Sequence, residues 1–170
     1  MTWARDDYTV TDDRDRLDLE AVHAYLTRSY WSTGVPLEVV RRAAAESVTF
    51  GLYLEGEQVG YARVVTDRAT FAYLCDVYVL EEHRGRGLGR WLVECVMDHP
   101  GLQGLRRWLL TTQDAHRFYE RLGFDRTTFP ERFMTIDRPG LYLDEPSARA
   151  SNRLAVTGAT SRSTQTHTSR

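Results

Sequence analysis

Residues 70–90 join the longest strand-like run of this chain to a helix through a segment of alternating glycines. Aromatic and β-branched side chains dominate residues 70–80, and such side chains favour a strand in the centre of a sheet. Apolar residues then recur from Leu88 onwards at the spacing of one helix face, until His99-Pro100-Gly101 ends the pattern. A strand that turns through glycines directly into a helix predicts a fold of the α/β (α+β) class.

The rest of the chain predicts further elements in the order β-αα-βββ-α-β-α-ββ. Pro36 is well placed to start a helix, Glu55-Gly56-Glu57 suits a hairpin turn, and Gly123 suits the residue beyond a helix end. The expected strands are residues 8–10, 48–54, 58–65, 70–80, 107–111, 124–129 and 133–136, and the expected helices are residues 17–28, 36–47, 88–98 and 115–122.

Composition excludes several classes of protein. Of the 170 residues, 42 % are hydrophobic and 27 % charged, with a formal net charge of −2, so we expect a globular domain with no nucleic-acid or membrane partner. No apolar run approaches the roughly 18 residues that span a bilayer, and the first residues lack a signal peptide's apolar segment, so we expect a cytoplasmic location. Cys75 and Cys95 are expected to be free thiols. The chain has no lysine, which excludes a P-loop and a Schiff-base mechanism.

The composition changes at about Asp144. Residues 145–170 are rich in Ser, Thr, Ala and Arg and carry four arginines against one acidic residue. Such a segment cannot bury enough apolar surface to offset its ordering entropy. We therefore predict one folded domain over residues 1–144 and a disordered tail over residues 145–170, with a weak electrostatic tether as the alternative for the tail.

The alternating glycines also indicate chemistry. A glycine turn at a helix N-terminus lets several backbone N–H groups converge, and the helix dipole adds to their attraction for an anion such as a pyrophosphate. A Rossmann fingerprint would need glycine at position 90, which is Arg90. A flexible connection without a ligand is the alternative interpretation. The histidines and cysteines show no metal-ligand spacing, and the chain has no Gly-x-Ser-x-Gly elbow.

Two motifs resemble those of the GNAT superfamily of acetyl-coenzyme-A-dependent N-acetyltransferases. Arg84-Gly85-Arg86-Gly87-Leu88-Gly89 is similar to the family signature Arg/Gln-x-x-Gly-x-Gly/Ala. The segment 115–124, which runs from Ala115 through Phe118-Tyr119 to Gly123-Phe124, resembles the second hallmark of the family. The element order over residues 8–137 is also similar. The resemblance implies a mixed, mostly antiparallel, twisted sheet with helices on both faces and a V-shaped opening beside the central strand.

The resemblance also implies where acetyl-coenzyme A (acetyl-CoA) binds. The matching cofactor contacts are the backbone of Val77, Tyr78 and Val79 for the pantetheine arm, the amides of Gly85, Arg86, Gly87, Leu88, Gly89 and Arg90 for the pyrophosphate, and the side chains of Arg84 and Arg86 for its charge. Many members have a cofactor-binding asparagine seven residues before the motif tyrosine, and this chain has Thr112 there, whose hydroxyl could partly substitute.

Tyr119 matches the family tyrosine that protonates the departing thiolate, whereas helical spacing alone would favour core packing. Asp76 is a carboxylate in the middle of an apolar strand, which suits either a general base or a structural ion pair. Glu81, Glu82 and His116 are weaker candidates for the base. Tyr30 and Trp31 precede Ser32-Thr33-Gly34 in the first helix–helix connection. In this family that connection covers the acceptor side. The two aromatic residues are therefore expected either to line the acceptor pocket or to pack into the core.

The resemblance implies transfer of the acetyl group of acetyl-CoA to a primary amine of a small molecule, by direct attack in a ternary complex. No metal is expected, and the protein is expected to be a monomer or homodimer. The alternatives are an inactive coenzyme-A-binding module and a protein or peptide N-acetyltransferase.

Overall fold

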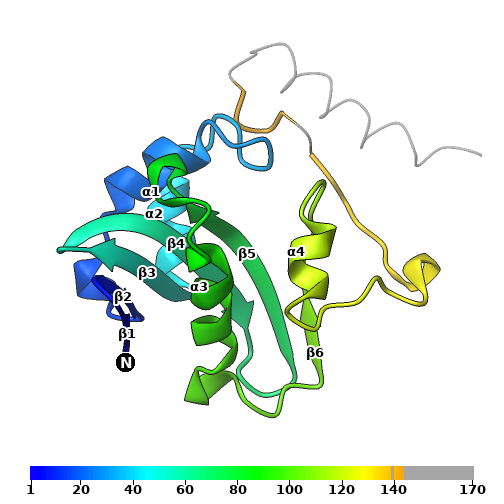
Figure 1. The fold of residues 1–170 in the computed structure, drawn as a ribbon. Coiled ribbons are helices and arrows are strands. Elements are labelled where there is room, and N and C mark those ends of the chain that lie inside the picture. The colour runs from blue at the N-terminus through cyan, green and yellow to red at the C-terminus, as the bar shows by residue number, and fades with distance from the viewer. Residues whose placement is uncertain (139, 144–170) are drawn as a thin grey trace, which may run out of the picture.

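The structure, a computed structural model, describes residues 1–138 and 140–143 and contains a six-stranded twisted sheet (Figure 1). The strands lie side by side in chain order, and every neighbouring pair is antiparallel except the parallel last pair. The strands are β1 (Thr2–Arg5), β2 (Tyr8–Thr11), β3 (Val48–Leu54), β4 (Glu57–Thr66), β5 (Phe71–Val79) and β6 (Arg107–Leu109).

Helices cover both faces of this sheet, as predicted. One face packs against α1 (Leu19–Leu26) and α2 (Leu37–Ala45) through a cluster that includes Tyr61 and Tyr78. The other face packs against α3 (Leu88–Met97) and α4 (His116–Glu120) in the larger apolar core. Short 3₁₀ turns occupy residues 14–16, 81–83, 100–102 and 130–132. No helix in the described part of the chain is long and apolar enough to cross a bilayer.

The two parallel strands diverge, and this creates the opening beside the central strand. β6 pairs only with the first three residues of β5, from Phe71 opposite Arg107 to Tyr73 opposite Leu109. β5 continues to Val79 and pairs there only with β4. Residues 74–79 of β5 therefore present one edge to the space between the strands.

A β-bulge interrupts the part of β5 that does not pair with β6. Arg63 of β4 lies opposite Cys75 and Tyr61 lies opposite Tyr78, so β5 has one residue more than β4 between these pairs. Asp76 adopts a left-handed conformation with φ of 54°. An aspartate tolerates this conformation better than a β-branched residue would, and a bulge leaves backbone groups without a ladder partner.

The sequence predicted most elements but missed one and placed two that do not form. Strand 48–54 has the predicted bounds, and Glu55 and Gly56 form the predicted hairpin turn with positive φ. β1 was not predicted; its hairpin with β2 turns at Asp6, which has φ of 51°. The predicted strands at 124–129 and 133–136 are wrong, because in the described structure these residues pair with no strand of the sheet, although the outer edge of β6 is unpaired. The predicted disordered tail lies outside the described residues.

Candidate active site

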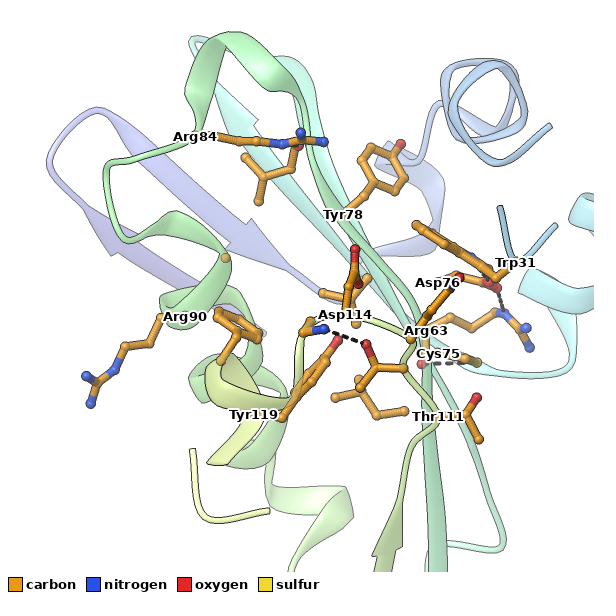
Figure 2. A pocket seen from close by; sticks show the side chains of 18 of the residues that line it. Trp31, Arg63, Cys75, Asp76, Tyr78, Arg84, Arg90, Thr111, Asp114 and Tyr119 are labelled. Carbon is orange, nitrogen blue, oxygen red and sulfur yellow. Dashed lines mark hydrogen bonds and ion pairs between the residues drawn. The ribbon is translucent and has the colours of Figure 1, made fainter. Parts of the chain in front are cut away.

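A cavity of about 1090 Å³ fills the opening between β5 and β6 (Figure 2). Its walls are β5, the glycine turn, the start of α3, the loop from β6 into α4, and the connection between α1 and α2. Single small-molecule sites occupy roughly 300–1,000 Å³, so this cavity lies at the upper end of that range.

The glycine turn forms one end of the cavity. Gly85 and Gly87 have φ of 77° and 75°, in the left-handed region that favours glycine. Gly87 is the N-cap residue directly before α3, and no side chain caps this end of the helix. The backbone N–H groups from Gly85 to Arg90 donate to no acceptor within residues 1–138 and 140–143. Six successive free donors at the positive end of a helix dipole form a site for an anion.

The three arginines around this turn have different surroundings. Arg84 lines the cavity, where its Nε donates to the Val79 carbonyl at 3.0 Å and its Nη2 donates to the Tyr25 hydroxyl at 2.9 Å. Arg90 also borders the cavity, but its side chain points away and its Nε donates to Glu94 at 2.7 Å (Figure 2). Arg86 does not line the cavity; its Nη1 donates to the Tyr8 hydroxyl at 3.3 Å. Of the two predicted charge donors, only Arg84 faces the cavity.

The backbone segment predicted to hold the pantetheine arm forms the long wall of the cavity. Val77, Tyr78 and Val79 all line it, with Leu88 and Gly89 at the start of α3. The ring of Tyr78 points to the opposite face of the sheet and stacks on Tyr25, with centroids 3.8 Å apart. A Cβ at Gly89 would make ordinary van der Waals contact with Phe118 and Val79 at 3.8 Å, so α3, α4 and β5 meet closely at this point.

Tyr119 reaches into the cavity from α4 (Figure 2). Its ring packs edge-on against Phe118 and Phe124. Its hydroxyl makes no hydrogen bond to the described residues, so the polar end of this half-buried side chain faces the cavity. Burial, with a smaller contribution from Tyr30 and Asp114, raises the pKa of Tyr119 to about 12. The phenol therefore keeps its proton throughout the physiological pH range.

Asp76 occupies the other end of the cavity in a small polar cluster. One carboxylate oxygen accepts from Arg63 Nε at 2.7 Å, and the other accepts from Trp31 Nε1 at 3.3 Å. The side chains of Arg63 and Asp76 are 18 % and 10 % exposed. Arg63 also donates to the Ser47 hydroxyl at 3.1 Å. Because both oxygens accept from donors, the geometry suits the structural ion pair of the two roles that the sequence left open.

We expect Asp76→Asn to act on stability more than on catalysis. The asparagine amide keeps one oxygen that can accept from Trp31 or Arg63, and asparagine tolerates the left-handed backbone. The substitution leaves the half-buried Arg63 guanidinium without a counter-charge, which costs about 1–3 kcal/mol. Thermal unfolding should show a lower Tm, while kcat and the shape of its pH profile stay close to those of the parent. Loss of turnover with an unchanged Tm would instead make Asp76 the general base.

Tyr30 and Trp31, which were predicted to line the acceptor pocket, connect the walls of the cavity. The Tyr30 hydroxyl accepts from the backbone N–H of Gln113 at 3.2 Å, and the indole N–H of Trp31 donates to Asp76 on β5. Their rings meet edge-on, 5.0 Å apart, and remain 54 % and 41 % exposed. Thr112 also lines the cavity, but its hydroxyl accepts from the Ala115 amide at 3.1 Å and so supports the turn before α4.

Sequence reasoning missed several lining residues. Asp114 is exposed, lines the cavity and makes no ion pair or hydrogen bond with the described residues; Figure 2 shows its side chain pointing inward. Asp114 directly precedes the second motif, and this position is the feature of the sequence that could have indicated its place in the site. The weaker base candidates Glu81, Glu82 and His116 are not among the lining residues. The other missed lining residues are Tyr25, Ser32, Arg63, Tyr73, Leu74, Cys75, Thr111, Gln113, Ala115, Phe118 and Arg121.

Comparison with known proteins agrees with this architecture. Residues 2–124 match the acetyltransferase (GNAT) family. A protein of Gibberella zeae described as a candidate acetyltransferase is 38 % identical over 147 residues, which cover 72 % of this chain and 82 % of that protein. A crystal structure of a candidate GNAT acetyltransferase from Xanthomonas campestris pv. campestris is 47 % identical and superposes with a TM-score of 0.78, covering 80 % of this chain and 96 % of that chain.

A more distant structure shares the fold alone. The glucosamine-6-phosphate N-acetyltransferase of Arabidopsis thaliana is 19 % identical with a TM-score of 0.55, over 77 % of this chain and 97 % of that chain. The chain belongs to the GNAT family and is an acetyltransferase. Members of this family use acetyl-CoA. Within the described residues, no three His, Cys, Asp or Glu side chains are grouped as metal ligands would be.

Proposed function

We propose that this protein transfers the acetyl group of acetyl-CoA to a primary amine of a small molecule, by direct attack while both substrates are bound. The observation that carries the proposal is the placement of Tyr119. It lies in one cavity between the free amides of the glycine turn and the polar end at Asp76, Asp114 and the exposed aromatics. One ligand can extend from the turn to Tyr119 while a second enters from the polar end.

The cofactor half of the cavity fits coenzyme A. Free amides from Gly85 to Arg90 suit the pyrophosphate, and no Cβ obstructs the turn at Gly85 or Gly87. The unpaired edge of β5 offers backbone groups to the pantetheine amides, in the manner of an added strand. Arg84, whose guanidinium also pairs with Glu81 at 3.2 Å, lines this end of the cavity. We infer that Val77, Tyr78 and Val79 hold the arm along the strand.

Tyr119 supplies the proton for the departing sulfur. Acetyl-CoA contributes an acetyl group activated as a thioester. When the acceptor nitrogen forms the new C–N bond, the C–S bond breaks and its electron pair leaves with sulfur. The Tyr119 hydroxyl, which has no competing partner in the described structure, gives its proton to this thiolate and regains one from solvent. The acceptor nitrogen loses its own proton to water in the open end of the cavity.

Asp114 is the residue that we assign to acceptor binding. Only two carboxylates, Asp76 and Asp114, line the described cavity, and Asp76 is already paired with Arg63. Asp114 therefore carries the acidic group that is free to attract an ammonium ion. The exposed faces of Tyr30 and Trp31 lie at the same end and can cover the carbon skeleton of the acceptor.

We expect Asp114→Asn to raise the KM for the acceptor amine about tenfold or more, which corresponds to about 1.4 kcal/mol or more. Because the carboxylate does not touch the reacting sulfur in this assignment, kcat at saturating amine and the affinity for acetyl-CoA should change little. Asp98→Asn removes the same charge outside the cavity and serves as the matched control. An unchanged KM in the Asp114 variant would remove this residue from the acceptor site.

A thiol-release screen tests the proposed function as a whole. The full chain and acetyl-CoA are incubated with small amines, amino acids, aminoglycosides and peptides, and the acetylated product is identified by mass spectrometry. Steady release with a small amine is the expected result. Release with peptides alone would favour a protein acetyltransferase, and tight binding of coenzyme A without turnover on any amine would favour a binding module.

A further inference from the structure

Four side chains connect the C-terminal end of α1 to the start of the glycine turn. The Tyr25 hydroxyl accepts from Nη2 of Arg84 at 2.9 Å, and one Glu81 oxygen accepts from the same nitrogen at 3.2 Å. The other Glu81 oxygen lies 3.5 Å from Nη2 of Arg28. The Arg28 guanidinium also lies over the Tyr25 ring, 4.8 Å from its centre. We call Tyr25, Arg28, Glu81 and Arg84 the α1–turn network.

The network fixes the orientation of the Arg84 guanidinium. Its Nε donates to the Val79 carbonyl at 3.0 Å, while its Nη2 donates to Tyr25 and Glu81. Its Nη1 donates to no acceptor within residues 1–138 and 140–143. Because a guanidinium is planar and presents its donors in a rigid fork, holding two of its nitrogens also sets the direction of the third. Arg84 therefore keeps one free nitrogen at the end of the cavity that it lines.

The charges of the network also suit an anion nearby. Two guanidinium groups, of Arg28 and Arg84, share the single carboxylate of Glu81, so two positive charges and one negative charge leave a surplus of one positive charge. These three side chains are 57 %, 52 % and 47 % exposed, and ion pairs so exposed to water contribute little to stability. Orientation of Arg84, rather than folding, is the effect that these contacts can have.

Tyr25 is the firmly held member of the network. Its ring stacks on Tyr78 with centroids 3.8 Å apart and planes 8° apart. Val22 and Leu26 on the same helix are buried in the apolar cluster against which Tyr25 packs. The Tyr25 hydroxyl is therefore an acceptor in a fixed position, whereas Glu81 is an exposed side chain on a short 3₁₀ turn.

We propose that Tyr25 is a positioning residue for the cofactor, whose hydroxyl holds Arg84 so that the free Nη1 can donate to the pyrophosphate at the glycine turn. The inference rests on the proposed function, in which the amides from Gly85 to Arg90 bind that pyrophosphate. Tyr25 acts through Arg84 and has no part in the chemical step. Loss of its hydroxyl therefore weakens only the share of binding that comes from the pyrophosphate.

Two ligands test this inference on Tyr25→Phe, which keeps the stacked ring and lacks the acceptor. Isothermal titration calorimetry should show a Kd for acetyl-CoA raised by about threefold to tenfold, the effect of one lost hydrogen bond. S-acetylpantetheine has the same thioester and arm without the pyrophosphate, and ligand-observed NMR titration should give it an unchanged Kd. The Tm should stay close to that of the parent.

Tyr61→Phe is the matched control. It removes a phenol oxygen from the same apolar cluster, outside the cavity and away from Arg84, so neither Kd should change. Weaker binding of S-acetylpantetheine to Tyr25→Phe would place the effect in the wall formed by Tyr78 and would overturn the inference. Parent-like affinity of Tyr25→Phe for acetyl-CoA would overturn it as well.

A double-mutant cycle tests whether Tyr25 acts through Arg84. In the Arg84→Gln background, Tyr25→Phe should cause no further loss of acetyl-CoA affinity. The same loss in both backgrounds would show a structural role for Tyr25 and overturn the inference while the pyrophosphate site stands. If the parent binds acetyl-CoA no more tightly than S-acetylpantetheine, the pyrophosphate site itself fails, and the inference fails with it.

Discussion

Tyr119→Phe is expected to lower kcat by about 10²–10⁴ while the affinity for acetyl-CoA stays close to that of the parent. The ring, which packs against Phe118 and Phe124, is kept, and the lost hydroxyl makes no hydrogen bond to the described residues. Stability should therefore change little. What the variant lacks is the proton for the departing thiolate. Steady-state kinetics and isothermal titration calorimetry measure the two quantities.

The pH profile provides a second test of Tyr119. Burial raises the pKa of its phenol to about 12, so the group stays protonated and competent as an acid from about pH 6 to 10. Over this range, kcat/KM should rise as the acceptor amine loses its proton, with no alkaline decline assignable to Tyr119. Tyr119→Phe should keep the rising shape at a much lower level.

Tyr53→Phe is a suitable control for this variant. Burial also raises the pKa of Tyr53 to about 12, but its hydroxyl donates to the Arg16 carbonyl outside the cavity. The control should lose stability of the order of one hydrogen bond, about 1 kcal/mol, and keep its turnover. If Tyr119→Phe is as active as this control at every pH, Tyr119 serves packing and is not the acid.

Gly87→Val is expected to weaken acetyl-CoA binding tenfold or more, which corresponds to at least about 1.4 kcal/mol. Gly87 has φ of 75° and begins α3, so a β-branched residue there is strained and must change the path of the turn. Any shift misaligns the free amides from Gly85 to Arg90. Titration calorimetry with acetyl-CoA measures the loss.

Gly104→Val separates lost binding from lost stability. Gly104 has nearly the same φ, 72°, with no neighbouring atom within 4 Å of the place that a Cβ would take, and it lies in the turn before β6 outside the cavity. Both variants should melt at lower temperature by similar amounts. Only Gly87→Val should bind acetyl-CoA more weakly; equal affinities in the two variants would rule out the glycine turn as the pyrophosphate site.

The cofactor half of the site could be predicted from the sequence because its determinants are local. The turn needs glycine at positions with positive φ, and the helix that follows supplies its amides whatever the rest of the chain does. Gly85 and Gly87 adopt this conformation, and α3 begins at Leu88 where the apolar spacing placed it. The same locality explains why β3 and its hairpin with β4 were predicted closely.

The polar end of the site depended on contacts between distant segments. Asp76 is paired with Arg63 across two strands, and its bulge arises from the register between β4 and β5. Arg86 lies beside the predicted anion site in sequence, yet Tyr8 of β2 holds it elsewhere. Asp114 directly precedes the second motif, but it lines the cavity only because β6 diverges from β5.

The last two predicted strands also show that residue types along the chain do not determine contacts between distant segments. Residues 124–129 and 133–136 have strand propensity, but a strand forms only where the segment lies against a pairing partner, and propensity does not determine that placement. The sequence by itself therefore determined most of the elements, the glycine turn and the motifs of the family, since each of these depends on residues close together in the chain. The tertiary structure alone decided which charged groups face the cavity and which strand edges stay open, because those depend on how segments far apart in the chain meet.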